Sequence, residues 1–97
     1  MITGNWETRD VFIDGRQLRP GKSQKIRNHS PNGFNWGYAG SGPSQLAIAI
    51  MLHFTKNKNR AMNLYQDFKW EIVAGLPQAN FTLDNSIVEN WIKEKTK

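Results

Sequence analysis

The stretch Gly33-Phe34-Asn35-Trp36-Gly37-Tyr38-Ala39-Gly40-Ser41-Gly42-Pro43 leads directly into the apolar run Leu46 to Phe54. From Asn28 to Thr55 there is no Asp, Glu, Lys or Arg, although charged residues make up 22% of the chain. The Ser-Gly-Pro sequence that ends the quoted stretch starts a helix, because serine or glycine can cap it and proline suits its first turn. The run that follows is apolar on nearly every face, so we expect this helix to be buried on all sides.

The residues before this helix predict an antiparallel sheet. Asp14-Gly15 is a two-residue hairpin turn signal between the strand formers Val11 to Ile13 and a return strand at Gln17-Leu18. Residues 24–28 alternate weakly and are interpreted as a third strand. Residues 34–38 alternate aromatic side chains with Asn and Gly, which predicts a further strand with one aromatic face.

Two more helices are expected in the C-terminal half. Apolar residues at helical spacing predict a helix from Arg60 to about Leu76, although residues 68–74 leave helix or strand open because part of them also alternates. Residues 81–83 are a short strand or a hydrophobic staple. Asp84 is a good N-cap for a last helix with an apolar face between Ile87 and Ile92.

Size and composition predict one small globular domain, residues 1–97, with a modest core that includes four Trp and five Phe. The expected fold class is α+β: a small N-terminal antiparallel sheet followed by about three helices. The absence of cysteine excludes disulfides, thiolate zinc sites and cysteine nucleophiles. No apolar run approaches the roughly 20 residues that span a bilayer, and no signal-peptide pattern is present, so we expect a cytoplasmic protein.

The chain is basic, with a formal net charge of +5. This charge favours acidic partners such as nucleic acid, nucleotides or an acidic protein. No helix-turn-helix or RNP-like motif is present, so a solvated basic surface is the plain interpretation and a phosphate-tracking surface is the functional one. The candidate nucleic-acid residues are Arg16, Arg19, Lys22, Lys25 and Arg27.

The glycine-serine turn that opens the central helix is a second candidate site. Backbone N–H groups at such a turn lie at the positive end of the helix dipole and suit phosphate or carboxylate. Nearby aromatic rings can stack on a base, and nearby cations can neutralise charge. The alternative is that the glycines only permit a tight turn and the aromatics belong to the core. The predicted ligand-binding residues are Lys25, Arg27, Trp36, Tyr38, Gly40, Ser41, Gly42 and Ser44.

Catalytic and metal-binding chemistry is not expected. His29 and His53 are the only histidines, and no carboxylate or second histidine stands at a metal-ligand or triad spacing from them. Asp67 and Glu71 share a helix face, which is typical of a solvated surface. The chain also lacks a Walker lysine and the G-x-G-x-x-G spacing, so we expect no cofactor, no metal and no enzymatic activity.

The central stretch resembles the signature G-F-x-W-G-Y-x-G-S-G-P-x-x-L-A of an uncharacterised family of small phage and bacterial proteins, a domain of unknown function. Asp14-Gly15 is similar to that family's D-G turn, and Ala61 to Phe68 and Ile87 to Ile92 are similar to its later elements. The resemblance implies no activity, cofactor or site residue. The family's occurrence in phages and mobile elements implies an accessory role such as counter-defence.

Two functions are therefore expected of this chain. The first is a non-enzymatic accessory protein that binds a phosphate-bearing small ligand, such as a nucleotide signal, at the glycine-serine turn. The second is a nucleic-acid-binding or protein-blocking inhibitor of a host defence system that uses the basic N-terminal surface. A homo-oligomer is plausible because four Trp are many for a domain of this size to hide. No membrane partner is expected.

Overall fold

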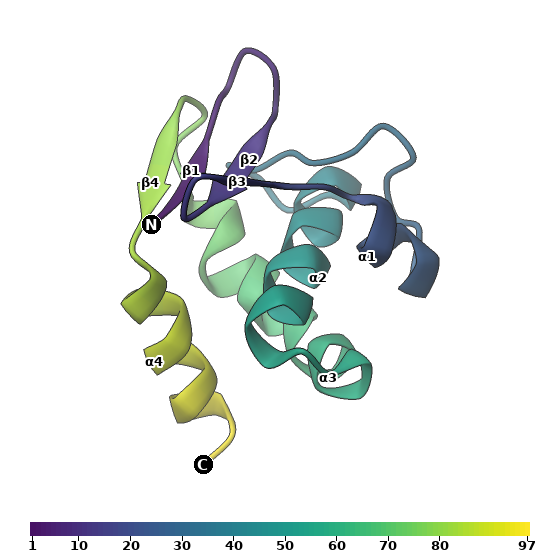
Figure 1. Cartoon of the computed structure of the whole chain (residues 1–97), viewed down its shortest axis with the longest axis vertical. Coiled ribbons are helices and arrows are strands. Elements are labelled where there is room, and N and C mark those ends of the chain that lie inside the picture. The colour runs from purple at the N-terminus through teal and green to yellow at the C-terminus, as the bar shows by residue number, and fades with distance from the viewer.

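The computed structural model describes residues 1–97 as an α+β fold in which a sheet lies against a group of helices (Figure 1). The predicted fold class is confirmed, with four α-helices in place of about three. The strands are β1 (Ile2–Gly4), β2 (Val11–Ile13), β3 (Arg16–Leu18) and β4 (Phe81–Leu83). The helices are α1 (Gly21–Ile26), α2 (Ser41–Thr55), α3 (Lys58–Glu71), the 3-10 turn η1 (Val73–Gly75) and α4 (Asn85–Lys95).

The sheet is antiparallel throughout, in the order β3-β2-β1-β4. The predicted hairpin is confirmed: Asp14 and Gly15 have φ values of 52° and 82°, the positive values that a type I′ turn requires. The strand at 81–83 is also confirmed, and it pairs with β1 in the register Ile2↔Leu83. The sheet is therefore mostly N-terminal, and β4 closes it from the far end of the chain.

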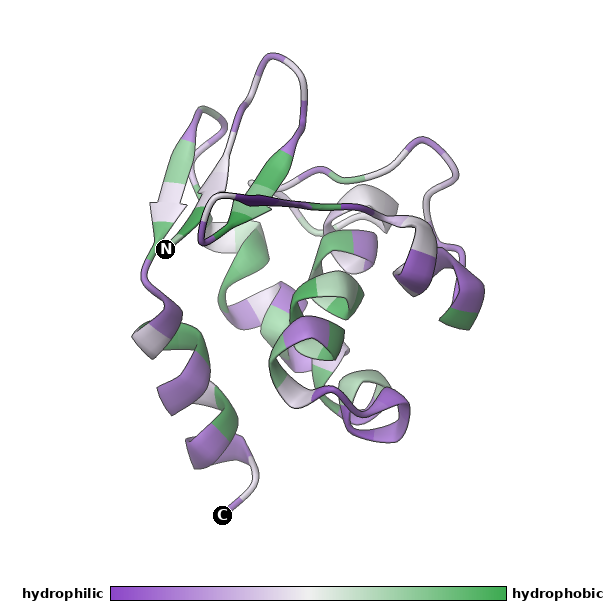
Figure 2. Cartoon of the chain, in the orientation of Figure 1, coloured by the Kyte–Doolittle hydropathy of each residue, from purple (hydrophilic) through white to green (hydrophobic).

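Helix α2 is the centre of the molecule, with the sheet and the other helices arranged around it (Figure 1). Every residue from Gly42 to Met51 is buried, so the predicted burial on all sides is confirmed for this part of the helix. Apolar residues dominate the middle of α2 (Figure 2). The helix reaches solvent at Ser41 and again in its last turns, where His53 is exposed although the apolar sequence around it predicts burial.

One polar side chain, Gln45, lies fully buried within this apolar helix. Its amide oxygen accepts hydrogen bonds from the backbone N–H groups of His29 at 2.8 Å and Ser30 at 3.0 Å. Its amide nitrogen donates to the Ser23 hydroxyl at 2.8 Å and to the Arg27 carbonyl at 3.1 Å. These four bonds use both donors and both acceptor positions of the amide. Gln45 thus fixes α1 and the segment after it against α2.

The prediction of a strand at residues 24–28 is wrong, because residues 21–26 form α1. The N–H of Gln24 and the hydroxyl of Ser23 both bond to the carbonyl of Pro20, which starts the helix. Ser23 is also one of the groups that Gln45 holds. A helix this short draws most of its stability from tertiary contacts, and a local alternation pattern does not contain that information.

The prediction of a strand at residues 34–38 is also wrong. Gly37 has φ +82°, which interrupts any extended run. The N–H of Trp36 bonds to the Asn35 side chain at 2.9 Å, and the N–H of Gly37 bonds to the Val73 carbonyl at 3.1 Å. The backbone of this segment is therefore satisfied by a side chain and by η1 instead of a neighbouring strand.

Trp36 of this irregular segment is an anchor of the core. It is fully buried, its indole N–H donates to the Ala79 carbonyl at 3.0 Å, and its ring meets Phe81 edge-on at a centroid distance of 4.8 Å. The Trp6 ring also packs edge-on against Trp36, at a centroid distance of 5.7 Å. These aromatic contacts join the segment before α2 to the N-terminal region and to β4.

Residues 68–71, for which the sequence left helix or strand open, continue α3, and the helical interpretation is correct there. The expected helix ends earlier than Leu76, because the chain turns into η1 after Glu71. Asn57 caps α3 by accepting from the Arg60 N–H at 3.0 Å. The predicted N-cap of α4 is confirmed as well: Asp84 accepts from the Ser86 N–H at 2.8 Å.

We predict that Gln45→Leu lowers the free energy of unfolding by about 2–4 kcal/mol, because it leaves two backbone N–H groups and a carbonyl without partners in the interior. Denaturant unfolding followed by circular dichroism measures this. Asn63→Leu on the exposed face of α3 is the control and should cost less than about 0.5 kcal/mol. Equal effects in the two variants would contradict the role assigned to Gln45.

Gly37→Ala should destabilise the protein more than Gly15→Ala. Both glycines have φ +82°, so the backbone strain of about 1–2 kcal/mol is shared. A Cβ at Gly37 would lie 2.7 Å from Gln78 Cγ and 3.1 Å from the Leu76 carbonyl oxygen, whereas a Cβ at Gly15 would meet nothing within 4 Å. The additional loss of unfolding free energy in Gly37→Ala should be about 1–3 kcal/mol because of overpacking. It is measured from the unfolding midpoints of the two variants in denaturant. Equal midpoints would contradict a steric requirement at Gly37.

Candidate anion-binding groove

An open groove of about 1020 Å³ lies between the β2–β3 hairpin, α1 and the C-terminal half of α2. Its position follows from the sheet order, because β3 is an edge strand. The register pairs Val11 with Leu18 and Ile13 with Arg16, so the side chains of Leu18 and Arg16 point to the core side of the sheet. Val11 and Ile13 are buried, whereas Leu18 is only half-buried and Arg16 is exposed. The helices thus leave the core-facing side of β3 partly uncovered, and that side forms one wall of the groove.

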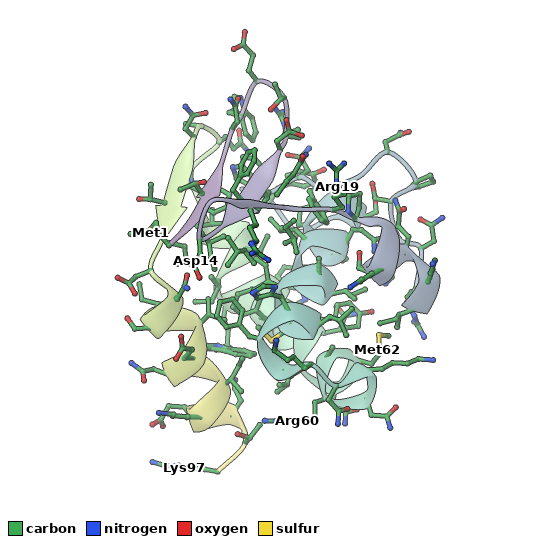
Figure 3. All side chains as sticks on the ribbon, viewed as in Figure 1. Met1, Asp14, Arg19, Arg60, Met62 and Lys97 are labelled. Atoms are coloured by element: carbon green, nitrogen blue, oxygen red, sulfur yellow. The ribbon has the colours of Figure 1, made fainter.

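Cationic side chains surround the groove. They are all exposed, and none takes part in an ion pair. Lys22 and Lys25 stand three residues apart on α1 and share a face, while the buried Ser23 points to α2. Arg19 lies in the segment that joins β3 to α1 (Figure 3). The cations that line the groove are Arg16, Arg19, Lys22, Lys25 and Lys56.

The floor and remaining wall of the groove are apolar or aromatic. The half-buried Leu18 and Leu52 and the buried Ile13 and Ala49 line the groove. The exposed imidazole of His53 also lines the groove, where its ring packs edge-on against Phe54 at a centroid distance of 5.2 Å. A ligand in the groove therefore meets a partly apolar floor that is surrounded by positive charge.

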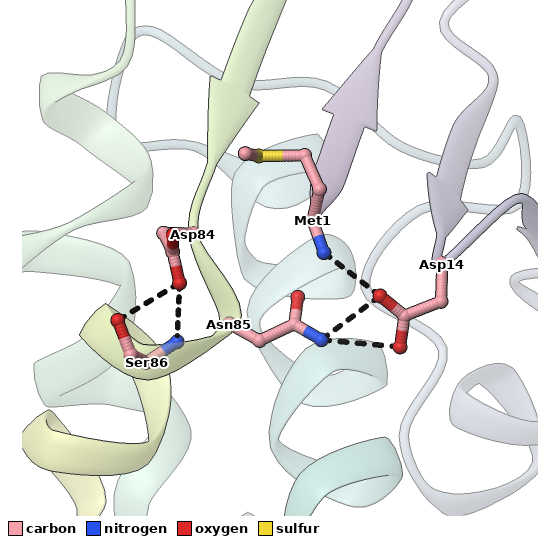
Figure 4. A network of polar contacts seen from close by, with 5 residues as sticks. All are labelled: Met1, Asp14, Asp84, Asn85 and Ser86. Carbon is pink, nitrogen blue, oxygen red and sulfur yellow. Dashed lines mark hydrogen bonds and ion pairs between the residues drawn. The ribbon is translucent and has the colours of Figure 1, made fainter.

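Asp14 is the single carboxylate along the groove, and it already has partners. It accepts from the Met1 amino group at 2.8 Å and from the Asn85 amide at 3.0 and 3.1 Å (Figure 4). These bonds, first that of the amino group and then that of Asn85, lower the pKa of Asp14 below its usual value. The carboxylate stays ionised and occupied, so it leaves the five cations uncompensated.

The groove brings together four of the five basic residues that the sequence singled out for nucleic acid, namely Arg16, Arg19, Lys22 and Lys25. Arg27 is exposed but does not line the groove. Sequence reasoning missed Lys56 and His53 as members. The available signal was modest: Lys56 is the first charge after the long neutral region, and it ends α2 with a left-handed φ of 53°.

The glycine-serine turn before α2 is closely packed. A Cβ at Gly42 would lie 2.6 Å from the Asn35 Cβ, and a Cβ at Gly40 would lie 2.6 Å from the Tyr38 ring. The Ser44 hydroxyl donates to the Gly40 carbonyl at 2.9 Å and so is not free for a ligand. These contacts give the two glycines and Ser44 structural roles.

The other residues predicted for that site are dispersed. Trp36 is fully buried and offers no ring face to a ligand, and Lys25 lines the groove described above. Tyr38 and Ser41 are exposed, and the helix N-cap is Gly40 without a side-chain hydrogen bond. A phosphate site at this turn stays a prediction.

His29 belongs to a separate polar cluster. Its Nε2 lies 3.0 Å from the Tyr65 hydroxyl, which also accepts a hydrogen bond from the Gln66 side chain. The tautomer of His29 determines whether its Nε2 or the Tyr65 hydroxyl donates in this hydrogen bond. Burial lowers the pKa of His29, and the nearby charges of Arg27 and Lys69 lower it further. The cluster holds α3 against the segment after α1.

No group of three or more His, Cys, Asp and Glu side chains lies close enough to hold a metal ion. No helix is both long and apolar enough to pass through a membrane.

The profile of DUF6166, described as a family of unknown function, matches residues 3–94. The chain therefore belongs to this family, which has an α+β fold in this member. No curated protein and no solved structure matches the chain.

We predict that stability falls as the pH drops below about 6.5, the pKa of histidine in an unfolded chain. Because the pKa of His29 is lower in the folded state, the unfolded state binds more protons in this range. The contribution is fully present above about pH 6.5 and is lost as the pH falls towards the folded pKa. Thermal unfolding between pH 5 and 8 measures it. His29→Gln, which does not titrate, should flatten the profile, and an unchanged profile would exclude His29 as the cause.

Proposed function

We propose that this protein binds nucleic acid in the basic groove and acts by binding, without catalysis. One observation carries the proposal: five cations without ion-pair partners surround a single groove whose only carboxylate is already occupied. Neutralising phosphates with such cations releases counterions, which supplies most of the affinity for a nucleic-acid backbone. The net charge of +5 assists the approach of a polyanion.

The placement of the cations supports this function over a purely solvated basic surface. Lys22 and Lys25 are carried by α1, which Gln45 fixes against α2, so their backbone positions are set by the fold. A phosphate-bearing small ligand at the glycine-serine turn remains the competing proposal. The family resemblance implies a counter-defence role. In that role, the protein would bind nucleic acid in its groove and so shield it from a host enzyme. A homo-oligomer stays a prediction of the sequence.

Reversing two groove charges should weaken binding strongly. For Arg19→Glu/Lys22→Glu we expect the affinity for an oligonucleotide to fall at least about tenfold at moderate salt. The slope of log K against log salt should become shallower by roughly 1.4–1.8, since each lost phosphate contact removes about 0.7–0.9. Fluorescence anisotropy across a salt series measures both quantities.

Arg60→Glu/Lys93→Glu is the matched control, because it changes the net charge equally at exposed residues that do not line the groove. It should retain most of the affinity and the salt slope. Equal losses in the two double variants would reduce the effect to net charge and overturn the groove assignment. Equally tight binding of polyglutamate would indicate an acidic protein partner. Loss of binding in Ser41→Asp alone would place the ligand at the N-terminus of α2.

A further inference from the structure

The basic groove combines positive charge at its rim with an apolar floor. A double helix complements the positive charge but not the apolar floor. In a duplex the base faces are stacked inside, so mainly phosphates, sugars and the narrow base edges can meet the partly exposed side chains of Leu18 and Leu52. Those side chains would then bury little apolar surface against the ligand, which gains little from the hydrophobic effect. A single strand has bases free to turn towards the floor while its phosphates remain at the rim.

We propose that the occupant of the groove is single-stranded nucleic acid, with at least one unstacked base lying against Leu18, Leu52 and the imidazole of His53. This inference rests on the proposed function and names the form of nucleic acid that the same groove takes. A base presents a flat π-face that packs on an aliphatic or aromatic side chain whatever its identity, so the contact is tolerant of sequence.

The dimensions and the placement of His53 support this occupant. The volume of about 1020 Å³ stands at the upper end of the roughly 300–1000 Å³ typical of small-ligand sites, so the groove has room for a short run of nucleotides. His53 is exposed and its ring is held edge-on against Phe54, which leaves an orientated aromatic surface at the wall. Lys56 follows three residues later at the end of α2, where its ammonium can meet the phosphate next to a base that lies on the His53 ring.

The test compares three fluorescein-labelled probes of equal length: a single-stranded oligonucleotide, the corresponding duplex and an abasic sugar-phosphate strand. We expect the single strand to bind about tenfold or more tighter than either of the others at moderate salt. The affinity for each of the three probes should fall as the salt concentration rises, because each probe binds through phosphate contacts. His53→Ala and Leu52→Ala should each weaken single-strand binding severalfold and leave binding of the abasic strand unchanged.

Trp70→Ala is the matched control, since Trp70 is 62% exposed on α3 and does not line the groove. It should leave all three affinities unchanged, and thermal melts should show that every variant is folded. Equal or tighter binding of the duplex, or equal binding of the abasic strand, would overturn the single-strand inference while the proposed nucleic-acid function stands. Loss of single-strand binding in Trp70→Ala would overturn the placement of the base. Absence of binding to every probe would overturn the proposed function as well.

Discussion

The buried amide of Gln45 is the constraint on which the arrangement of the N-terminal half depends. A primary amide in an apolar interior is stable only when its hydrogen-bonding groups are satisfied, and here the partners come from α1 and from residues 27–30. These segments contain few large apolar side chains with which to dock. Their position against α2 is therefore determined by hydrogen-bond geometry, which is more directional than apolar packing. The same bonds place the helix that carries Lys22 and Lys25.

A second constraint is that the helices cover the sheet incompletely. The sheet has four strands, and on its edge strand β3 the core-facing Leu18 is only half-buried and Arg16 is exposed. A groove with positive charge and a partly apolar floor results. It is enclosed by these side chains of β3, by the lysines of α1 and by the end of α2. Like charges close together repel in the free protein, so binding of an anion relieves that repulsion. A ligand that binds only the folded state also stabilises the fold by mass action.

The glycine-aromatic segment has its clearest role in packing. Trp36 joins three parts of the chain through Trp6, Phe81 and the Ala79 carbonyl. Arg9 extends the cluster, because its guanidinium lies 3.6 Å from the centroid of the Trp6 ring and its Nε donates to the Asn35 side chain at 3.1 Å. The glycines lie where neighbouring groups approach too closely for a Cβ, as at Gly37 and Gly42. A specific local sequence here reflects dense tertiary contacts.

The sequence by itself determined the features that depend on nearby residues. These are the Asp14-Gly15 hairpin, the buried helix after Pro43, the N-cap at Asp84 and the basic residues of the N-terminal half, because turn chemistry, apolar runs and charge can be read locally. Only the tertiary structure decided that residues 21–26 form a helix, since one bond of Gln45 reaches Ser23 of this helix from α2 and the other three hold residues 27–30 directly after it. It also decided which cations share a groove. That selection requires β3 to be an edge strand and Lys56 to return beside it, a meeting of residues far apart in the chain that no local pattern records.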